Sequence, residues 1–124
     1  MPIVNQTPLT SLADKLVTVS VVSNTVNNNI TDATTGTIYI IEVDNLGSAG
    51  VGAYLKIADA SSATVGTTQP KLSLYIPPET KQTFALQNGH TYTAGLCVWA
   101  TRNPGYTDNT KPDAALTVKF LVTA

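Results

Sequence analysis

The sequence predicts an all-β protein: a single antiparallel β-sandwich of about seven or eight short strands, preceded by an extended N-terminal arm. Apolar and polar residues alternate with a period of two in short segments that are rich in β-branched residues. Turn-forming residues separate these segments at intervals typical of a sandwich. Helical periodicity is nearly absent, because only residues 11–15 resemble a single turn that Ser11 would cap.

The predicted strands are short runs in which apolar positions alternate, except that residues 37–46 are apolar enough to predict a central strand buried on both faces. The runs are residues 16–22, 37–46, 53–58, 72–76, 81–86, 92–101 and 116–122. Pro77 and Pro78 end the fourth run because neither has an N–H for a ladder. Asn88-Gly89 predicts a turn after the fifth run. The strand order stays open, since Ig-like Greek-key and jelly-roll connections join similar short strands.

A chain of 124 residues fits one domain with its own core. We expect an arm over residues 1–15 and the sandwich over residues 16–124. Residues 24–36, which include Asn27, Asn28 and Asn29, are expected to form a long polar connection or an edge strand weakened by asparagine. The strands before residue 37 could therefore find their partners in another subunit.

The composition excludes several classes of partner. Charged residues make up 12% of the chain, about half of the roughly 25% typical of soluble domains, and the net charge is −1. Because no run of either sign occurs, we expect neither nucleic acid nor a membrane as a partner. The first residues lack the pattern of a secretory signal, and no apolar run approaches the ~20 residues of a membrane span, so synthesis in a cytoplasm is expected.

No metal or cofactor site is predicted. His90 is the only histidine, and it is expected to be an exposed residue beside the Asn88-Gly89 turn. Glu42 and Asp44 share one strand face, where they could bind calcium but more simply face solvent or pair with a lysine on a neighbouring strand.

The acidic residues late in the chain also fail to match a calcium loop. Asp108, Asn109 and Asp113 lack the required order of ligands, so they are not taken as a metal site.

Catalytic motifs are also missing from the sequence. No serine lies in a G-x-S-x-G elbow, and Gly47, Gly50 and Gly52 have the wrong order for a phosphate-binding loop. Cys97 is expected to be a small buried hydrophobic residue. We therefore expect a protein that is not an enzyme. A hydrolase remains a third alternative, in which His90 or a carboxylate would serve as the base.

Two aromatic residues are the candidates for an interaction surface. Tyr106 follows Asn103-Pro104-Gly105 in a loop, where exposure is expected. Trp99 either faces outward or packs in the core or against another subunit, because Val98 and Ala100 occupy the opposite strand face.

From residue 37 onward, the order of segments resembles small β-sandwich proteins of tailed-bacteriophage virions. The segments that carry this resemblance are YIIEVDN at 39–45, AYLKIADA at 53–60, TVGTTQP at 64–70, YIPP at 75–78 and YTAGL at 92–96. They cover about the last two-thirds of the chain. These segments are structural in character, so they point to a fold more than to a task.

The resemblance implies a virion structural protein, made in the host cytoplasm. The expected role is that of a capsid decoration or cement protein that stabilises the head shell, bound to itself as a homo-oligomer, with a trimer expected, and to the major capsid protein. The alternative is a tail, baseplate or fibre component. In that case the loops at residues 61–69 and 103–112 would contact a host glycan.

Overall fold

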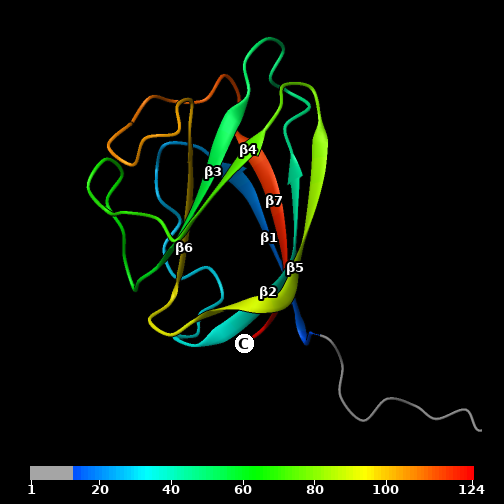
Figure 1. Cartoon of the computed structure of the whole chain (residues 1–124), viewed down its shortest axis with the longest axis vertical. Coiled ribbons are helices and arrows are strands. Elements are labelled where there is room, and N and C mark those ends of the chain that lie inside the picture. Colours follow the sequence, from blue (N-terminus) through cyan, green and yellow to red (C-terminus); the bar gives the residue numbers. More distant parts are fainter. Residues whose placement is uncertain (1–12) are drawn as a thin grey trace, which may run out of the picture.

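The computed structural model describes residues 13–124, so the predicted arm lies outside the described residues except for its last three positions. These residues form seven strands and no helix, in two facing sheets, which confirms the predicted β-sandwich (Figure 1). The strands are β1 (Lys15–Val22), β2 (Gly36–Asp44), β3 (Ala53–Asp59), β4 (Leu72–Ile76), β5 (Lys81–Tyr92), β6 (Leu96–Thr101) and β7 (Leu116–Thr123). No helix long and apolar enough to cross a membrane occurs within residues 13–124.

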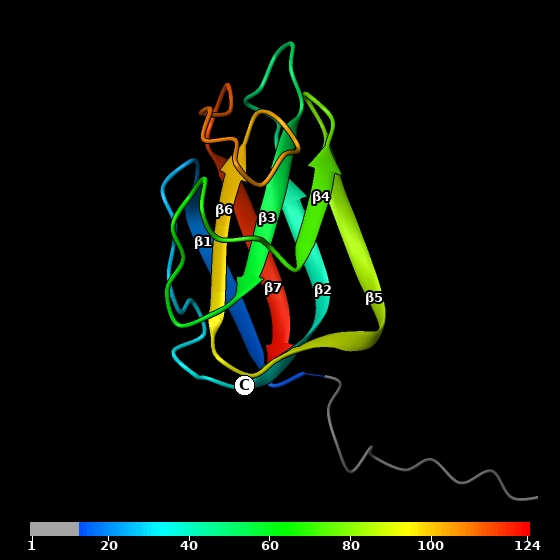
Figure 2. The ribbon, with the colours of Figure 1, turned by 60° about the vertical axis from the view of Figure 1, so that its left-hand side comes forward.

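The two sheets have the strand orders β1-β7-β2-β5 and β4-β3-β6, and every paired strand is antiparallel to its neighbour. Figure 2 shows β1 and β5 at opposite margins of the four-stranded sheet. The chain changes sheet at each connection between these strands except the one between β1 and β2 and the one between β3 and β4.

Residues 23–30 act as an irregular eighth strand beside β6. Asn27 and Val98 exchange backbone hydrogen bonds of 2.9 and 3.0 Å, and the Ala100 N–H donates to the Ser23 carbonyl at 2.8 Å. With this segment counted, the second sheet has the order (23–30)-β6-β3-β4. That order, together with β1-β7-β2-β5, is the connectivity of a jelly roll.

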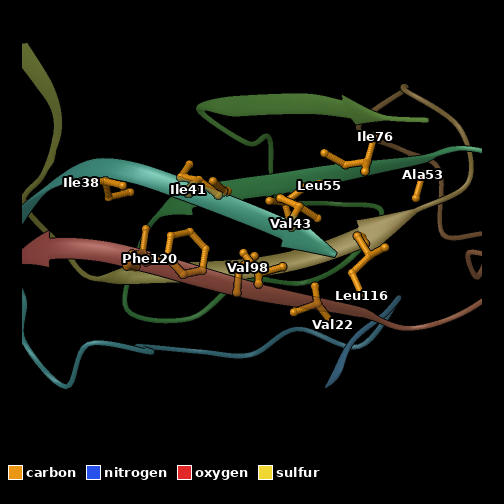
Figure 3. Packing of buried hydrophobic residues seen from close by; sticks show 14 of the residues in the cluster. Val22, Ile38, Ile41, Val43, Ala53, Leu55, Ile76, Val98, Leu116 and Phe120 are labelled. Atoms are coloured by element: carbon orange, nitrogen blue, oxygen red, sulfur yellow. The ribbon is translucent and has the colours of Figure 1, made fainter. Parts of the chain in front are cut away.

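The core fills the space between the two sheets (Figure 3). It is built from the alternate residues that each strand turns inward, and its members are fully buried: Val22, Ile38, Ile41, Val43, Leu55, Ile57, Ile76, Leu96, Val98, Leu116, Val118, Phe120 and Val122. Burial of one such side chain contributes about 1.5–3 kcal/mol of transfer free energy. The apolar positions of the predicted alternation are therefore the residues that form this core.

The predicted turn at Asn88-Gly89 is wrong, because β5 continues through it to Tyr92. Both residues have positive φ, 64° and 76°, and β2 changes register against β5 between Ile38 and Ile40. Two consecutive left-handed residues here produce a bulge that bends the strand instead of reversing it. His90 is accordingly a half-buried strand residue opposite Ile38, and its expected place in an exposed turn is also wrong.

The reversal lies instead at residues 93–95, between β5 and β6, so the predicted strand over residues 92–101 is divided in two. The Asp59 carboxylate accepts hydrogen bonds from the backbone N–H groups of Thr93 at 3.0 Å and Ala94 at 2.8 Å. Burial alone would raise the pKa of Asp59, but these hydrogen bonds outweigh that effect and hold the pKa below its ordinary value. Gly95 completes the turn with a φ of 131°.

Candidate interaction surfaces

Trp99 lies in a second apolar cluster on the outer face of the three-stranded sheet. It packs there with Ala58 and Cys97 under the partly buried side chains of Val26, Ala63 and Val65. The exposed fraction of Trp99 is 0%. Its assignment to an interaction surface is therefore wrong, and the alternative of core packing is correct. Cys97, also fully buried, is the small core residue that was expected.

Two loops cover Trp99, and a hydrogen bond joins them to each other. The Ala63 N–H donates to the Asn28 side-chain oxygen at 3.0 Å, which links residues 60–68 to the segment that borders β6. Two parts of the chain that lie 35 positions apart thus close over one face. The continuous apolar run of β6 is typical of a strand buried on both faces, but it does not reveal which segments of the chain form the cover.

Lys56, the cross-strand neighbour of Trp99, is also fully buried. Its ammonium group donates a hydrogen bond of 2.6 Å to the carbonyl of Gly105. Burial lowers the pKa of the Lys56 amine, and the nearby Asp108 carboxylate offsets part of that lowering. This contact attaches the loop between β6 and β7 to the outer face of β3.

Tyr106 follows Gly105 directly in this loop and is 45% exposed, so the structure bears out its predicted exposure. Asp108 organises the loop by accepting hydrogen bonds from the Asn103 N–H at 3.1 Å and the Thr110 hydroxyl at 2.8 Å. Burial would raise the pKa of Asp108, but the hydrogen bonds from Thr110 and Asn103 hold it below its ordinary value. Tyr106 is thus presented on a fixed loop.

A tyrosine pair that the sequence did not reveal lies on the same outer face. Tyr54 and Tyr75 are register partners on β3 and β4, with ring centroids 5.1 Å apart and ring planes inclined by 48°. Tyr75 is 50% exposed. The pair lies where β3 begins and β4 ends, and Figure 2 shows the loop between β6 and β7 at that end of the sandwich. Finding the pair requires the strand register, which local patterns do not supply.

The outer face of the four-stranded sheet carries one apolar row across all four strands. It consists of Leu16, Leu121, Ile40 and Ala85, which are successive register partners. A groove of about 450 Å³ lies at the β5 end of this row, where Tyr39, Ile40, Ala85 and Leu86 contribute to its lining. The next row is polar, and in it Glu42 lies opposite Lys119.

The expected cross-strand lysine partner of Glu42 is present. The Glu42 carboxylate forms an ion pair of 3.2 Å with Lys81 of the neighbouring strand. Asp44 accepts the backbone N–H of Leu46 at 2.9 Å. Asp113 pairs with Arg102. Within residues 13–124, no three His, Cys, Asp or Glu side chains lie close enough together to hold a metal ion.

The free margin of β1 borders a second groove, of about 500 Å³. Val17, Thr18, Val19, Ser20 and Val21 form one wall, and the other is formed by Val26, Asn27, Asn28 and Ile30. None of these side chains is charged. The exposed fractions of Leu16 and Val21 are both 63%, which are large values for aliphatic residues of a strand. We call this uncharged feature at the free edge of β1 the β1 groove.

Comparison with protein-family models, with curated proteins and with solved structures gives no match to this chain.

Proposed function

We propose that this chain is a non-enzymatic structural protein of a virion, which acts as a capsid decoration or cement protein after assembling with copies of itself, in a trimer. The observation that carries this proposal is the unpaired edge of β1, with the exposed Leu16 and Val21 beside an uncharged groove. Natural proteins rarely leave such an edge open, because it pairs with other chains. A stable partner chain is the simplest cover for it.

The strand connectivity supports this proposal. Jelly rolls are common among viral capsid domains and lectins, so the order of the two sheets agrees with the segments that resemble phage virion proteins. A shared fold alone does not assign a function. Here two independent features, the segment resemblance and the open edge, favour the same class of protein.

The surface chemistry fits a contact with the major capsid protein. Charged residues are only 12% of the sequence, and apolar side chains such as Leu46 and Val51 are exposed in the loop between β2 and β3. Contacts with a shell would then rely on apolar and neutral polar groups, and we expect binding to change little with salt concentration. The site of action under this proposal is the virion.

Two measurements test the proposed function. Light scattering coupled to size exclusion should give three times the 13.0 kDa mass of one chain. Antibodies raised against the chain should label the head shell of purified particles. Label confined to the tail would favour the alternative below, and absence of label from particles would contradict both assignments.

The second candidate is a tail, baseplate or fibre component that adheres to a host glycan. The observation in its favour is the set of tyrosines at one end of the three-stranded sheet, where Tyr75 and Tyr106 are about half exposed. Sugar rings stack on such aromatic faces. Binding to a glycan array that is lost in Tyr75→Ala and Tyr106→Ala, but kept in the matched surface change Leu16→Ala, would support it. No binding by the wild-type oligomer would count against it.

A further inference from the structure

The backbone of β1 has one side free for strand pairing. The Val122 carbonyl points toward β1, because it accepts the Asp14 N–H at 3.1 Å. Its register partner is Lys15, and register partners in an antiparallel ladder point their backbone groups the same way relative to each other, so Lys15, Val17 and Val19 point theirs toward β7. Because neighbouring residues in a strand point in opposite directions, the N–H and C=O groups of Leu16 and Thr18 point to the free side of β1. Among residues 13–124, β7 is the only strand that pairs with β1.

The other strand edges are protected. Residues 23–30 cover β6. β4 has only five residues, and Pro70 and the pair at positions 77 and 78 flank it. β5 contains the bulge at Asn88 and Gly89, which interrupts a regular edge. The β1 groove is therefore where an added strand fits best.

Residues 1–12 match this groove in charge and length. The segment contains no charged side chain, and neither does the lining of the groove. The charge of Lys15, at the start of β1, has a partner within the chain, because its ammonium group donates to the Thr31 carbonyl at 3.0 Å. Twelve extended residues reach about 40 Å, which exceeds the roughly 26 Å of an eight-residue strand such as β1.

The direction of the chain at Asp14 favours a groove on another copy. Asp14 still lies beside the end of β7, where its carboxylate accepts the Ala124 N–H at 3.2 Å. The chain thus extends past the end of β1. To return along its own β1 it would need a tight turn, and the only strong turn former in residues 9–13 is Ser11.

We propose that residues 1–12 of one copy bind in the β1 groove of a neighbouring copy and add a strand to its four-stranded sheet. This inference rests on the proposed self-assembly and specifies its contact. Donor segment and acceptor groove are different surfaces, so the contact is heterologous and closes when copies form a ring. Added strands bind mainly through backbone hydrogen bonds, here to Leu16 and Thr18.

Amide hydrogen exchange, read together with the oligomeric mass, tests the proposal. In the full chain we expect the amides of Leu16 and Thr18 to exchange at least about tenfold more slowly than in a chain that lacks residues 2–12. A second variant, Val4→Asp with Leu9→Asp, should release the same two amides while leaving residues 13–124 unchanged. This double variant is used in place of the truncated chain if the truncated chain does not fold.

The combined outcomes separate this inference from the proposed function. An oligomer in which Leu16 and Thr18 exchange equally fast with and without the segment overturns the inference and leaves self-assembly standing. A monomer in which the two amides are protected shows that the segment binds its own chain, which also overturns the inference. A monomer with unprotected amides contradicts both proposals.

Disulfide trapping identifies the neighbour directly. A tagged chain carrying Leu9→Cys is mixed with an untagged chain carrying Ser20→Cys, so every disulfide between the introduced cysteines joins two copies. The native Cys97 stays in both chains because it is buried. The matched control replaces Ser20→Cys with Thr83→Cys, an exposed position on β5 at the opposite margin. We expect a mixed disulfide at Ser20→Cys alone, and equal yields at both positions would overturn the proposal.

Discussion

The ammonium group of Lys56 and the carbonyl of Gly105 form a 2.6 Å hydrogen bond that joins the middle of the three-stranded sheet to the loop carrying Tyr106. The two residues lie 49 positions apart, and the donor is fully buried. A buried lysine is costly unless its charge is compensated, and here the carbonyl and the nearby Asp108 provide that compensation. Lys56 thus holds a loop in place from beneath.

Replacing this lysine tests the attachment of the loop. We expect Lys56→Met to lower the free energy of unfolding by about 1–3 kcal/mol, because the carbonyl of Gly105 loses a charged donor. Amides of residues 102–110 should also exchange faster. The matched control is Lys111→Met, at an exposed lysine of the same loop, which should change neither quantity. Unchanged loop exchange in Lys56→Met would show that the contact does not hold the loop.

The buried indole of Trp99 gives a separate prediction. Trp99→Ala should lower the free energy of unfolding by about 3–5 kcal/mol through the cavity it leaves. Trp99→Phe should cost much less, because the ring is retained and the indole N–H, which has no hydrogen-bond partner in the described structure, is removed. Urea denaturation of the two variants measures the difference.

As the only tryptophan, Trp99 also reports its own environment. Iodide should fail to quench its fluorescence in the folded protein. Strong quenching before unfolding would contradict the loop cover over β6.

Gly95 provides a comparison of two glycines. Its φ is 131°, and a Cβ there would lie 2.7 Å from the Ala60 carbonyl oxygen. Gly95→Ala should therefore destabilise the fold by about 2 kcal/mol or more. At Gly50 a Cβ would meet no atom within 4 Å, so Gly50→Ala should leave the melting temperature nearly unchanged. Equal melting temperatures for the two variants would exclude a strained turn.

Acid should weaken the turn that Asp59 holds. The pKa of Asp59 is lowered in the folded protein, so below about pH 4 the unfolded chain takes up a proton that the folded chain does not. Stability from this group is therefore present above that pH and is lost as the pH falls through the folded pKa. We expect Asp59→Asn to reduce the loss of stability between about pH 5 and pH 3, measured by urea denaturation. Ser61→Ala, an exposed neighbour, should retain the wild-type loss.

The fold class could be predicted from the sequence because inward-facing residues alternate in every strand that faces the core. The alternation of Leu116, Val118, Phe120 and Val122 places β7 directly. The turn predicted at Asn88-Gly89 was wrong because these two residues favour a hairpin turn and a bulge alike. Only pairing with the neighbouring strand, β2, decides between the two.

The candidate surfaces were harder to predict because they depend on contacts between distant segments. Trp99 is buried by loops that no periodicity describes. Tyr54 and Tyr75 meet only once β3 and β4 are in register. Tyr106 was predictable, since the loop residues before it require a surface position.

Residues 23–30 also determine how the protein behaves when it is concentrated. This segment is hydrogen-bonded to β6, at one margin of the three-stranded sheet. That margin therefore cannot pair with strands of other molecules and start an amyloid fibril. Asn27 is the central residue of this contact. Its backbone N–H and C=O both bond to Val98, and its side chain donates to the Val21 carbonyl at 3.2 Å. Asn27→Pro would open the margin by removing a backbone donor, and we expect such a variant to form thioflavin-positive fibrils under conditions in which the wild-type protein remains in solution.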